Sequence, residues 1–166
     1  MENPNPDVES VEESDFLESL TLADILALSD DDYECVTQEE VFQLVKDIKD
    51  PEHPELSLAQ LRVVKKDQIF VHNSDVLLEY TPTIPTCSVA VLIGLTLLRK
   101  LQLCLPQRFA VHVKIRQGKH VQEIQVNKQL GDKERVAAAM ENPNLSKLIR
   151  QGLYKTDTLP EGLLIW

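Results

Sequence analysis

Cys87 is the residue whose position most favours a reactive side chain, because it follows the proline-rich segment 81–86 and opens a long apolar stretch. That stretch predicts a helix that begins at this thiol and ends near Cys104, with Thr86 or Ser88 as its cap. A thiol in the first turn of a helix faces unpaired backbone N–H groups and the positive end of the helix dipole, which both stabilise a thiolate. The competing interpretation is a small buried residue that fills the helix start, since free cysteines are often buried. These residues alone favour the two interpretations equally.

The other two cysteines are expected to be unreactive. Cys104 ends the apolar stretch and is predicted to lie in the core, whereas Cys35 lies among acidic residues that disfavour a thiolate. Three widely spaced cysteines fit neither a disulfide framework nor a Cys-x-x-Cys metal or redox pair.

The four histidines lack the spacing of a metal site, so solvated or structural roles are expected for most of them. His120 is the exception, because it lies in a loop just after a predicted strand, where α/β folds place functional groups. A thiol enzyme would need His120 or another histidine to meet Cys87 in space. The others are His53, His72 and His112, the last on the polar side of a predicted strand.

Composition and motifs disfavour two further classes of function. The glycines stand alone, so the motifs of nucleotide-hydrolysing and dinucleotide-binding proteins are absent. Aromatic residues make up 5% of the chain and do not alternate with basic ones, so direct nucleic-acid binding has little support. The stretch 127–135 is dense in both charges, which is typical of a solvated helix surface with ion pairs. The alternative is partner binding, with the candidate residues Asn127, Lys128, Asp132, Lys133 and Arg135.

The first half of the body is predicted to form one helix and two β-rich runs. A capping box at 37–40 starts the helix, and the prolines of segment 50–54 end it. A second capping box at 57–60 predicts a short turn. The β-rich runs cover about 61–71 and 76–81, and the polar turn between them resembles that of a hairpin.

The second half is predicted to continue with the apolar helix, one strand and two more helices. Strict alternation over 109–115 predicts a half-buried strand, which makes a strand, helix, strand crossover. A helix over 121–141 with a bend at Gly131 and a short helix over 145–153 complete the body. The fold class is therefore α/β (α+β): a single small domain with a mixed sheet of three or slightly more strands, packed against helices.

The charge of the chain is divided between two regions. The formal net charge of the 166 residues is −10, but residues 1–45 hold 14 acidic and no basic residues, whereas the remainder holds 17 basic and 13 acidic residues. We therefore expect an acidic, largely disordered leader at 1–36, a body at 37–155 and a tail at 156–166. Residues 15–28 combine acidic with apolar residues at roughly helical spacing. They are expected to be mobile, to dock on their own body or to fold onto a partner groove.

Targeting signals and membrane spans are not evident. The most apolar stretch, 89–98, is interrupted by two basic residues and is shorter than the roughly 20 residues that a bilayer requires. The acidic start has neither a secretory signal nor a mitochondrial presequence. The expected location is the cytosol, with the nucleus left open, and no membrane contact is expected.

Several segments of the body, in collinear order from about 41 to 153, resemble one eukaryotic family. They are DIKDPEHP (47–54), LAQLRVV (58–64), TPTIPTCS (81–88), LIGL (92–95), LPQR (105–108), VNKQL (126–130) and DKERVAAAMEN (132–142). The family is that of the cytosolic iron–sulfur assembly targeting subunits of the MMS-nineteen-interacting type, with SufT-like bacterial relatives. Motifs of this length are highly specific.

The resemblance implies a non-enzymatic adaptor that works with a WD-repeat propeller subunit and a HEAT-repeat adaptor subunit. Such a complex delivers [4Fe-4S] clusters to cytosolic and nuclear apoproteins, including enzymes of DNA replication and repair. The resemblance also implies that Cys87 is the reactive cysteine that cluster delivery requires. Because a cubane cluster requires four ligands, one thiolate would hold it only transiently, and no stably bound cofactor is expected. A homodimer is left open.

Two departures from the family pattern bear on the site. The family commonly has histidine where this chain has Thr86, and its Gly-Thr-His segment reads Gly118-Lys119-His120 here. The tail ends in Leu-Ile-Trp, which weakly resembles the tripeptide at the end of many clients of this pathway, although packing on the body is the simpler explanation. Two rivals to the adaptor remain: a stand-alone thiol enzyme, and a structural bridge whose cysteine is inert.

Overall fold

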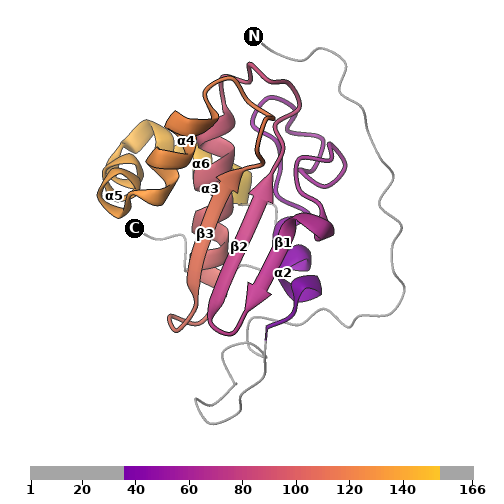
Figure 1. Cartoon of the computed structure of the whole chain (residues 1–166). Helices are drawn as coiled ribbons and strands as arrows, with labels where there is room; N and C mark the ends of the chain where they lie inside the picture. The colour runs from indigo at the N-terminus through magenta and orange to yellow at the C-terminus, as the bar shows by residue number, and fades with distance from the viewer. Residues whose placement is uncertain (1–35, 154–166) are drawn as a thin grey trace.

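The computed structural model describes residues 36–153, so the predictions for residues 1–35 and 154–166 lie outside the described residues. This part of the chain forms one mixed sheet with helices packed against one of its faces (Figure 1). The elements in chain order are α2 (Gln38–Val45), a 3-10 turn (Lys66–Gln68), β1 (Ile69–His72), β2 (Asp75–Tyr80), α3 (Ala90–Cys104), β3 (Ala110–Ile115), α4 (Glu123–Gly131), α5 (Lys133–Glu141) and α6 (Pro143–Leu153).

The sheet has the order β1-β2-β3 and contains both kinds of pairing, as predicted. β1 and β2 form an antiparallel hairpin in which Phe70 lies opposite Leu77. β2 and β3 are parallel, with Leu78 opposite Val113, and α3 is the crossover between them. The two loops that leave the carboxyl ends of β2 and β3 therefore emerge at the same end of the sheet.

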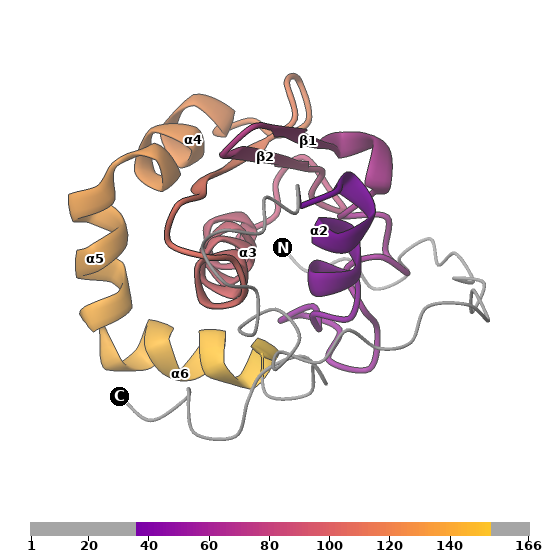
Figure 2. The same cartoon turned by 90° about the horizontal axis from the view of Figure 1, so that it is seen from below.

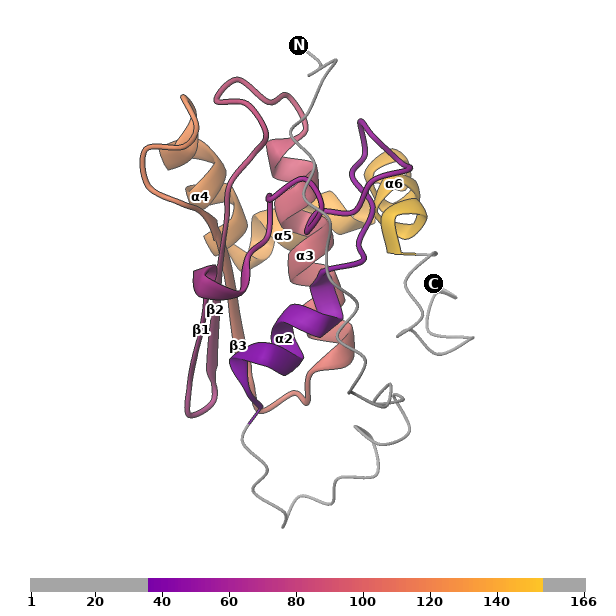
Figure 3. The ribbon, with the colours of Figure 1, turned by 90° about the vertical axis from the view of Figure 1, so that its right-hand side faces the viewer.

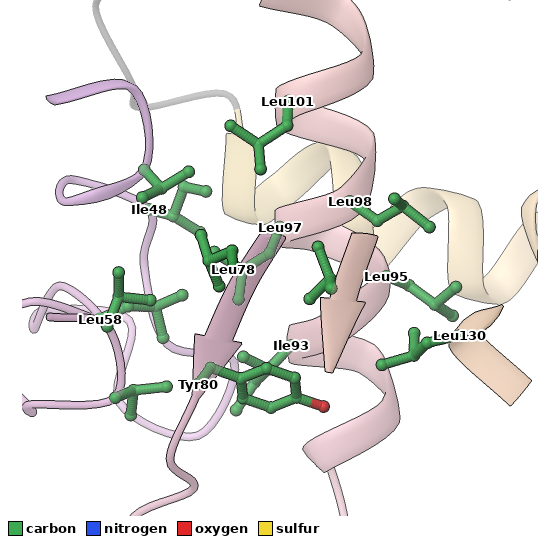
Figure 4. Close-up of a cluster of buried hydrophobic side chains, with 14 of the residues drawn as sticks. Ile48, Leu58, Leu78, Tyr80, Ile93, Leu95, Leu97, Leu98, Leu101 and Leu130 are labelled. Carbon is green, nitrogen blue, oxygen red and sulfur yellow. The ribbon is translucent and has the colours of Figure 1, made fainter. Parts of the chain in front are cut away.

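α3 lies at the centre of the molecule, against one face of the sheet (Figure 3). Seen from below, α2, α4, α5 and α6 are arranged around it (Figure 2). All of its leucines except the half-buried Leu103 are accordingly buried, with Leu95, Leu97 and Leu101 fully inaccessible to solvent. They pack against the inner face of β2, where Leu78 and Tyr80 are also fully buried (Figure 4). A helix that is apolar on most of its surface is expected where other elements surround it, and Gln102 is the one exposed residue of α3.

Amide side chains occupy both edges of the sheet. At the start of β1, the Gln38 Nε2 group donates to the Ile69 carbonyl (2.8 Å) and to the Lys66 carbonyl of the preceding 3-10 turn (2.6 Å). On β3, Asn127 Oδ1 accepts from the Ile115 N–H (2.7 Å) and Asn127 Nδ2 donates to the Ile115 carbonyl (3.3 Å). Asn127 thereby makes the pair of hydrogen bonds that a neighbouring strand would make.

The first β-rich run is shorter than predicted. The capping box at 57–60 is present, because the Ser57 hydroxyl accepts from the Gln60 N–H and the Gln60 side chain accepts from the Ser57 N–H. After it, Arg62 adopts a left-handed φ of 56°, and the N–H groups of Val63 and Val64 both turn back to one carbonyl. The chain from 61 to 68 is therefore a compact turn, and only residues 69–72 form a strand.

The predicted helix over 121–141 is two helices. α4 ends at Gly131, and Asp132 adopts extended backbone geometry with its carboxylate accepting from the N–H groups of Glu134 and Arg135. An aspartate in this geometry is a strong N-cap, so it starts α5 instead of continuing α4. The last helix begins at Pro143, two residues earlier than predicted, because the Asn142 side chain caps it. Within 36–153, no helix is long and apolar enough to span a membrane.

Candidate functional site

The candidate site lies where the loops after β2 and β3 meet. The Arg116 N–H donates to the Tyr80 carbonyl (2.9 Å), which extends the strand pairing by one step. Beyond it, the Val121 N–H donates to the Pro85 carbonyl (2.9 Å). These bonds hold the segment that carries Cys87 against the segment that carries His120.

Cys87 precedes the helix instead of opening it. α3 begins at Ala90, its N-cap is Val89, and no side chain caps it. The predictions that the helix starts at Cys87 and that Thr86 or Ser88 caps it are therefore wrong. The Cys87 N–H donates to the Ile84 carbonyl (3.2 Å), so the thiol lies in a turn that the proline-rich segment forms before the helix.

The environment of Cys87 favours the protonated thiol. The residue is 4% exposed, and burial raises the pKa of its thiol above the ordinary value. A hydrogen bond with the Val89 backbone acts in the opposite direction, but the nearby carboxylates of Glu52 and Asp50 raise the pKa further. The predicted stabilisation of a thiolate is thus wrong for this conformation, because the loss of hydration outweighs the backbone contribution.

The carboxylates near the thiol come from the loop after α2, a neighbour that the sequence reasoning missed. Asp50 is 3% exposed, and its Oδ1 accepts from the N–H groups of Glu52 (2.8 Å) and His53 (3.0 Å). The loop is anchored at its base by a bridge between Lys49 and Ser57. The sequence had indicated a helix stop at 50–54 and a family motif at 47–54, and no local signal pointed to Cys87.

His120 lies beside Cys87, as a thiol site would require, but it binds the backbone. Its Nδ1 accepts from the Gln122 N–H (3.1 Å), so Nε2 carries the proton and donates to the Cys87 carbonyl (3.1 Å). Both ring nitrogens are thus engaged, and neither is hydrogen-bonded to the thiol. In this arrangement His120 positions the cysteine loop and does not act as a base on the sulfur.

An open pocket of about 310 Å³ forms between these two loops and the first turns of α3 and α4. Thr86 and Ser88 are exposed beside the buried Cys87, and both line the pocket. The pocket brings together the reactive-thiol candidate and all three of its predicted supporting residues. Its lining includes Thr86, Cys87, Ser88, His120, Val121 and Val126.

Tyr80 and Gly94 fix the start of α3 beneath this pocket. The sequence had not suggested a role for either residue. The buried Tyr80 hydroxyl donates to the Ala90 carbonyl (2.8 Å), which ties the first turn of α3 to the end of β2. Burial raises the pKa of this hydroxyl, so it remains a donor. A Cβ atom on Gly94 would lie 2.5 Å from Leu130 Cδ1 and 2.8 Å from the Tyr80 oxygen. A glycine inside an apolar helix was the available signal for this close approach.

The charged stretch 127–135 has structural roles at several positions. Asn127 pairs with β3, and Asp132 both caps α5 and forms an ion pair with Arg135 (Oδ2 to Nε, 3.2 Å). Lys128 and Lys133 are exposed. Partner binding by these residues stays a prediction.

The other two cysteines and the possible metal ligands were compared with the candidate site in the same way. Cys104 is 2% exposed and lies in the core, as predicted, and Cys35 lies outside the described residues. In the described part of the chain, no group of three or more His, Cys, Asp or Glu side chains could hold a metal ion.

Comparison with known proteins first identifies the class of protein to which this chain is similar. Residues 38–115 match the model of a family described as iron–sulfur cluster assembly protein, and this match includes Cys87. Three relatives extend it. MIP18 family protein galla-2 of Drosophila melanogaster is 53% identical over 114 residues, covering 68% of this chain and 72% of that protein. Cytosolic iron-sulfur assembly component 2B of Mus musculus is 52% identical over 116 residues, covering 69% and 71%. A MIP18 family protein of Schizosaccharomyces pombe is 41% identical over 168 residues, covering 90% and 93%.

This chain belongs to the MIP18 family of iron–sulfur cluster assembly proteins. The resemblance drawn from the motifs of the body is thereby confirmed.

Proposed function

We propose that this protein is an adaptor in cytosolic iron–sulfur assembly, and that it helps to deliver [4Fe-4S] clusters to cytosolic and nuclear apoproteins through Cys87. The role in cytosolic assembly is supported by family membership and by relatives named cytosolic iron-sulfur assembly component 2B in Mus musculus and Dictyostelium discoideum. The observation that carries the assignment of Cys87 is its place in a pocket where the loops after two parallel strands meet.

The cluster is the cargo of this reaction, and Cys87 supplies one of its four ligands for a short time. A thiol binds iron as a thiolate, so its proton leaves when the iron–sulfur bond forms. Because burial and the carboxylates of the Asp50 loop raise the pKa of Cys87, the free protein keeps a protonated thiol. Ligation therefore depends on the positive charge of the iron and on exposure of the sulfur. The other three ligands come from a partner, a second subunit or the client.

The expected assembly follows from the same proposal. The protein contacts a WD-repeat propeller subunit, a HEAT-repeat adaptor subunit and the apoprotein clients, and it acts in the cytosol and the nucleus. It binds neither nucleic acid nor membrane directly and carries out no catalysis of its own. Thr86 and Ser88 shape the pocket mouth, and His120 holds the cysteine loop.

A structural bridge with an inert cysteine is the second candidate, and the burial of Cys87 favours it. Replacing Cys87 by serine separates the two. The adaptor proposal predicts that Cys87→Ser retains partner pull-down but loses cluster loading of a client, measured by iron and sulfide analysis and by absorption under anaerobic conditions. Cys104→Ser is the matched control at a buried core cysteine, and it should retain loading. Full client loading by Cys87→Ser would refute the role of the thiol and support the bridge.

A further inference from the structure

The loop between β3 and α4, residues 116–122, holds the turn that contains Cys87. Two hydrogen bonds join the loop to the turn. His120 Nε2 donates to the Cys87 carbonyl (3.1 Å), and the Val121 N–H donates to the Pro85 carbonyl (2.9 Å). Because Cys87 is buried, a reagent reaches its sulfur only when this turn moves. The groups that hold the loop in place therefore also decide how often the thiol is exposed.

Glu123, the first residue of α4, fastens this loop to the helix. Its Oε2 atom accepts from the Gly118 N–H (2.6 Å), and its own N–H donates to the His120 carbonyl (3.2 Å). Gly118 has a left-handed φ of 75°, and the Lys119 N–H donates to the Arg116 carbonyl (3.2 Å), so the tip of the loop is a tight turn. The carboxylate thus holds the tip of the loop against the start of α4.

The base of the loop is closed by Asn127, one turn further along α4. Asn127 makes two hydrogen bonds with the backbone of Ile115, the last residue of β3. Because Glu123 and Asn127 are four residues apart, they lie on the same side of the helix. One side of α4 therefore holds both the base and the tip of the loop that contacts the cysteine turn.

We propose that Glu123 is a positioning residue for the thiol: its carboxylate holds the loop, and the loop, through His120, keeps Cys87 covered. The sequence had not pointed to Glu123, which is a half-buried side chain at a helix start. Its hydrogen bond to a backbone N–H is charge-assisted, and such bonds are stronger than neutral ones. Without this bond the tip of the loop detaches more readily, so the form with an open cysteine turn gains population.

The covering of the thiol is a property of the free protein and does not depend on cluster chemistry. Its consequence for cluster transfer rests on the proposed function, in which the sulfur must be exposed before it binds iron. In that reaction Glu123 would help to keep the thiol covered until delivery begins.

Alkylation of the full-length protein tests this role, with two cysteines read separately. The rates at which iodoacetamide modifies Cys87 and Cys104 are followed on their own peptides by mass spectrometry. Glu123→Ala should raise the rate at Cys87 about three- to tenfold, as expected for the loss of one hydrogen bond. The rate at Cys104 should stay unchanged, because this core cysteine is 2% exposed and reacts only after wider unfolding.

Two further variants separate the hydrogen bond from other effects. Glu123→Gln keeps an oxygen acceptor for the Gly118 N–H, so it should retain most of the slow alkylation at Cys87. Glu141→Ala, at an exposed glutamate of α5, is the matched control and should leave the rate unchanged. An unchanged rate at Cys87 in Glu123→Ala would overturn the proposal. Equal increases at Cys87 and Cys104 would also overturn it, because they indicate a general loss of stability.

A double substitution tests whether Glu123 acts through His120. His120→Ala removes the hydrogen bond to the Cys87 carbonyl and should by itself raise the alkylation rate. Adding Glu123→Ala should then raise the rate by less than it does alone, because both substitutions release the same turn. The full three- to tenfold increase in this background would refute the connection. Full client loading by Cys87→Ser would be a separate result, which refutes the proposed function and leaves the covering of the thiol by Glu123 in place.

Discussion

Gly94→Ala should destabilise the protein even though alanine is the better helix former. The added methyl group would lie 2.5 Å from Leu130 Cδ1 and 2.8 Å from the Tyr80 oxygen, both well inside van der Waals contact. Neither neighbour can move away cheaply. Leu130 is 5% exposed, and the fully buried Tyr80 hydroxyl is hydrogen-bonded to the Ala90 carbonyl. In Figure 4 the Tyr80 hydroxyl and the Leu130 side chain point toward each other beside the part of α3 that carries Ile93 and Leu95.

The expected change in the free energy of unfolding has three contributions, of which two are destabilising and one is stabilising. Overpacking of a core by one methyl group costs about 1–3 kcal/mol. Displacement of the tyrosine would weaken its hydrogen bond, which contributes about 0.5–1.5 kcal/mol. Replacing glycine by alanine within a helix raises the free energy of unfolding by about 1 kcal/mol. The expected net loss is about 2 kcal/mol, or a decrease in Tm of about 6–12 °C for a body of this size.

Gly131→Ala is the matched control, because no atom lies within 4 Å of the position of its Cβ. This variant should leave stability unchanged or raise it by up to about 1 kcal/mol. Urea unfolding followed by circular dichroism measures both variants, and Leu130→Val in the Gly94→Ala background should recover part of the loss. If Gly94→Ala were as stable as Gly131→Ala, the close approach of α3, α4 and Tyr80 would be refuted.

Two further predictions concern the sheet edge and the thiol. Asn127→Ala should lower the free energy of unfolding by about 1–3 kcal/mol, because it leaves the Ile115 N–H and carbonyl unpaired, whereas Lys128→Ala should be neutral by the same urea assay. An equal effect of both variants would contradict the role of Asn127. Because burial and the nearby carboxylates raise the pKa of Cys87, the midpoint of its alkylation rate against pH should lie above the ordinary thiol value of about 8.5. Asp50→Asn keeps an oxygen acceptor but removes a negative charge, so it should shift this midpoint to lower pH. A midpoint at or below the ordinary value in the parent protein would refute the effect of burial.

The parts of the fold that depend on local sequence could be predicted. The box at Thr37 forms as expected, with its hydroxyl accepting from the Glu40 N–H and the Glu40 carboxylate accepting from the Thr37 N–H. The alternation along β3 likewise places Val113 and Ile115 inside the core. Hydrogen bonds over three residues and the two-residue repeat of a strand are both visible in a single stretch of sequence.

The errors concern features that tertiary contacts decide. An apolar run does not specify its first helical residue, so Cys87 was placed in a helix that begins at Ala90. The sequence did not show that Cys87 and His120 meet in space. The choice of the carbonyl over the thiol depends on the Gln122 N–H, which fixes the ring tautomer. The acidic loop at Asp50 reaches the thiol from a distant part of the chain. Periodicity and spacing contain no information about such an approach.

The amides at the two margins of the sheet have a consequence for how copies of this protein can associate. A three-stranded sheet offers backbone donors and acceptors along both sides, and such edges are templates for intermolecular strand addition and aggregation. Gln38 occupies this template at Ile69, and Asn127 occupies it at Ile115. An incoming strand would have to displace these side chains before it could pair at either position. At these two positions the amide side chains therefore oppose the addition of a strand from another chain.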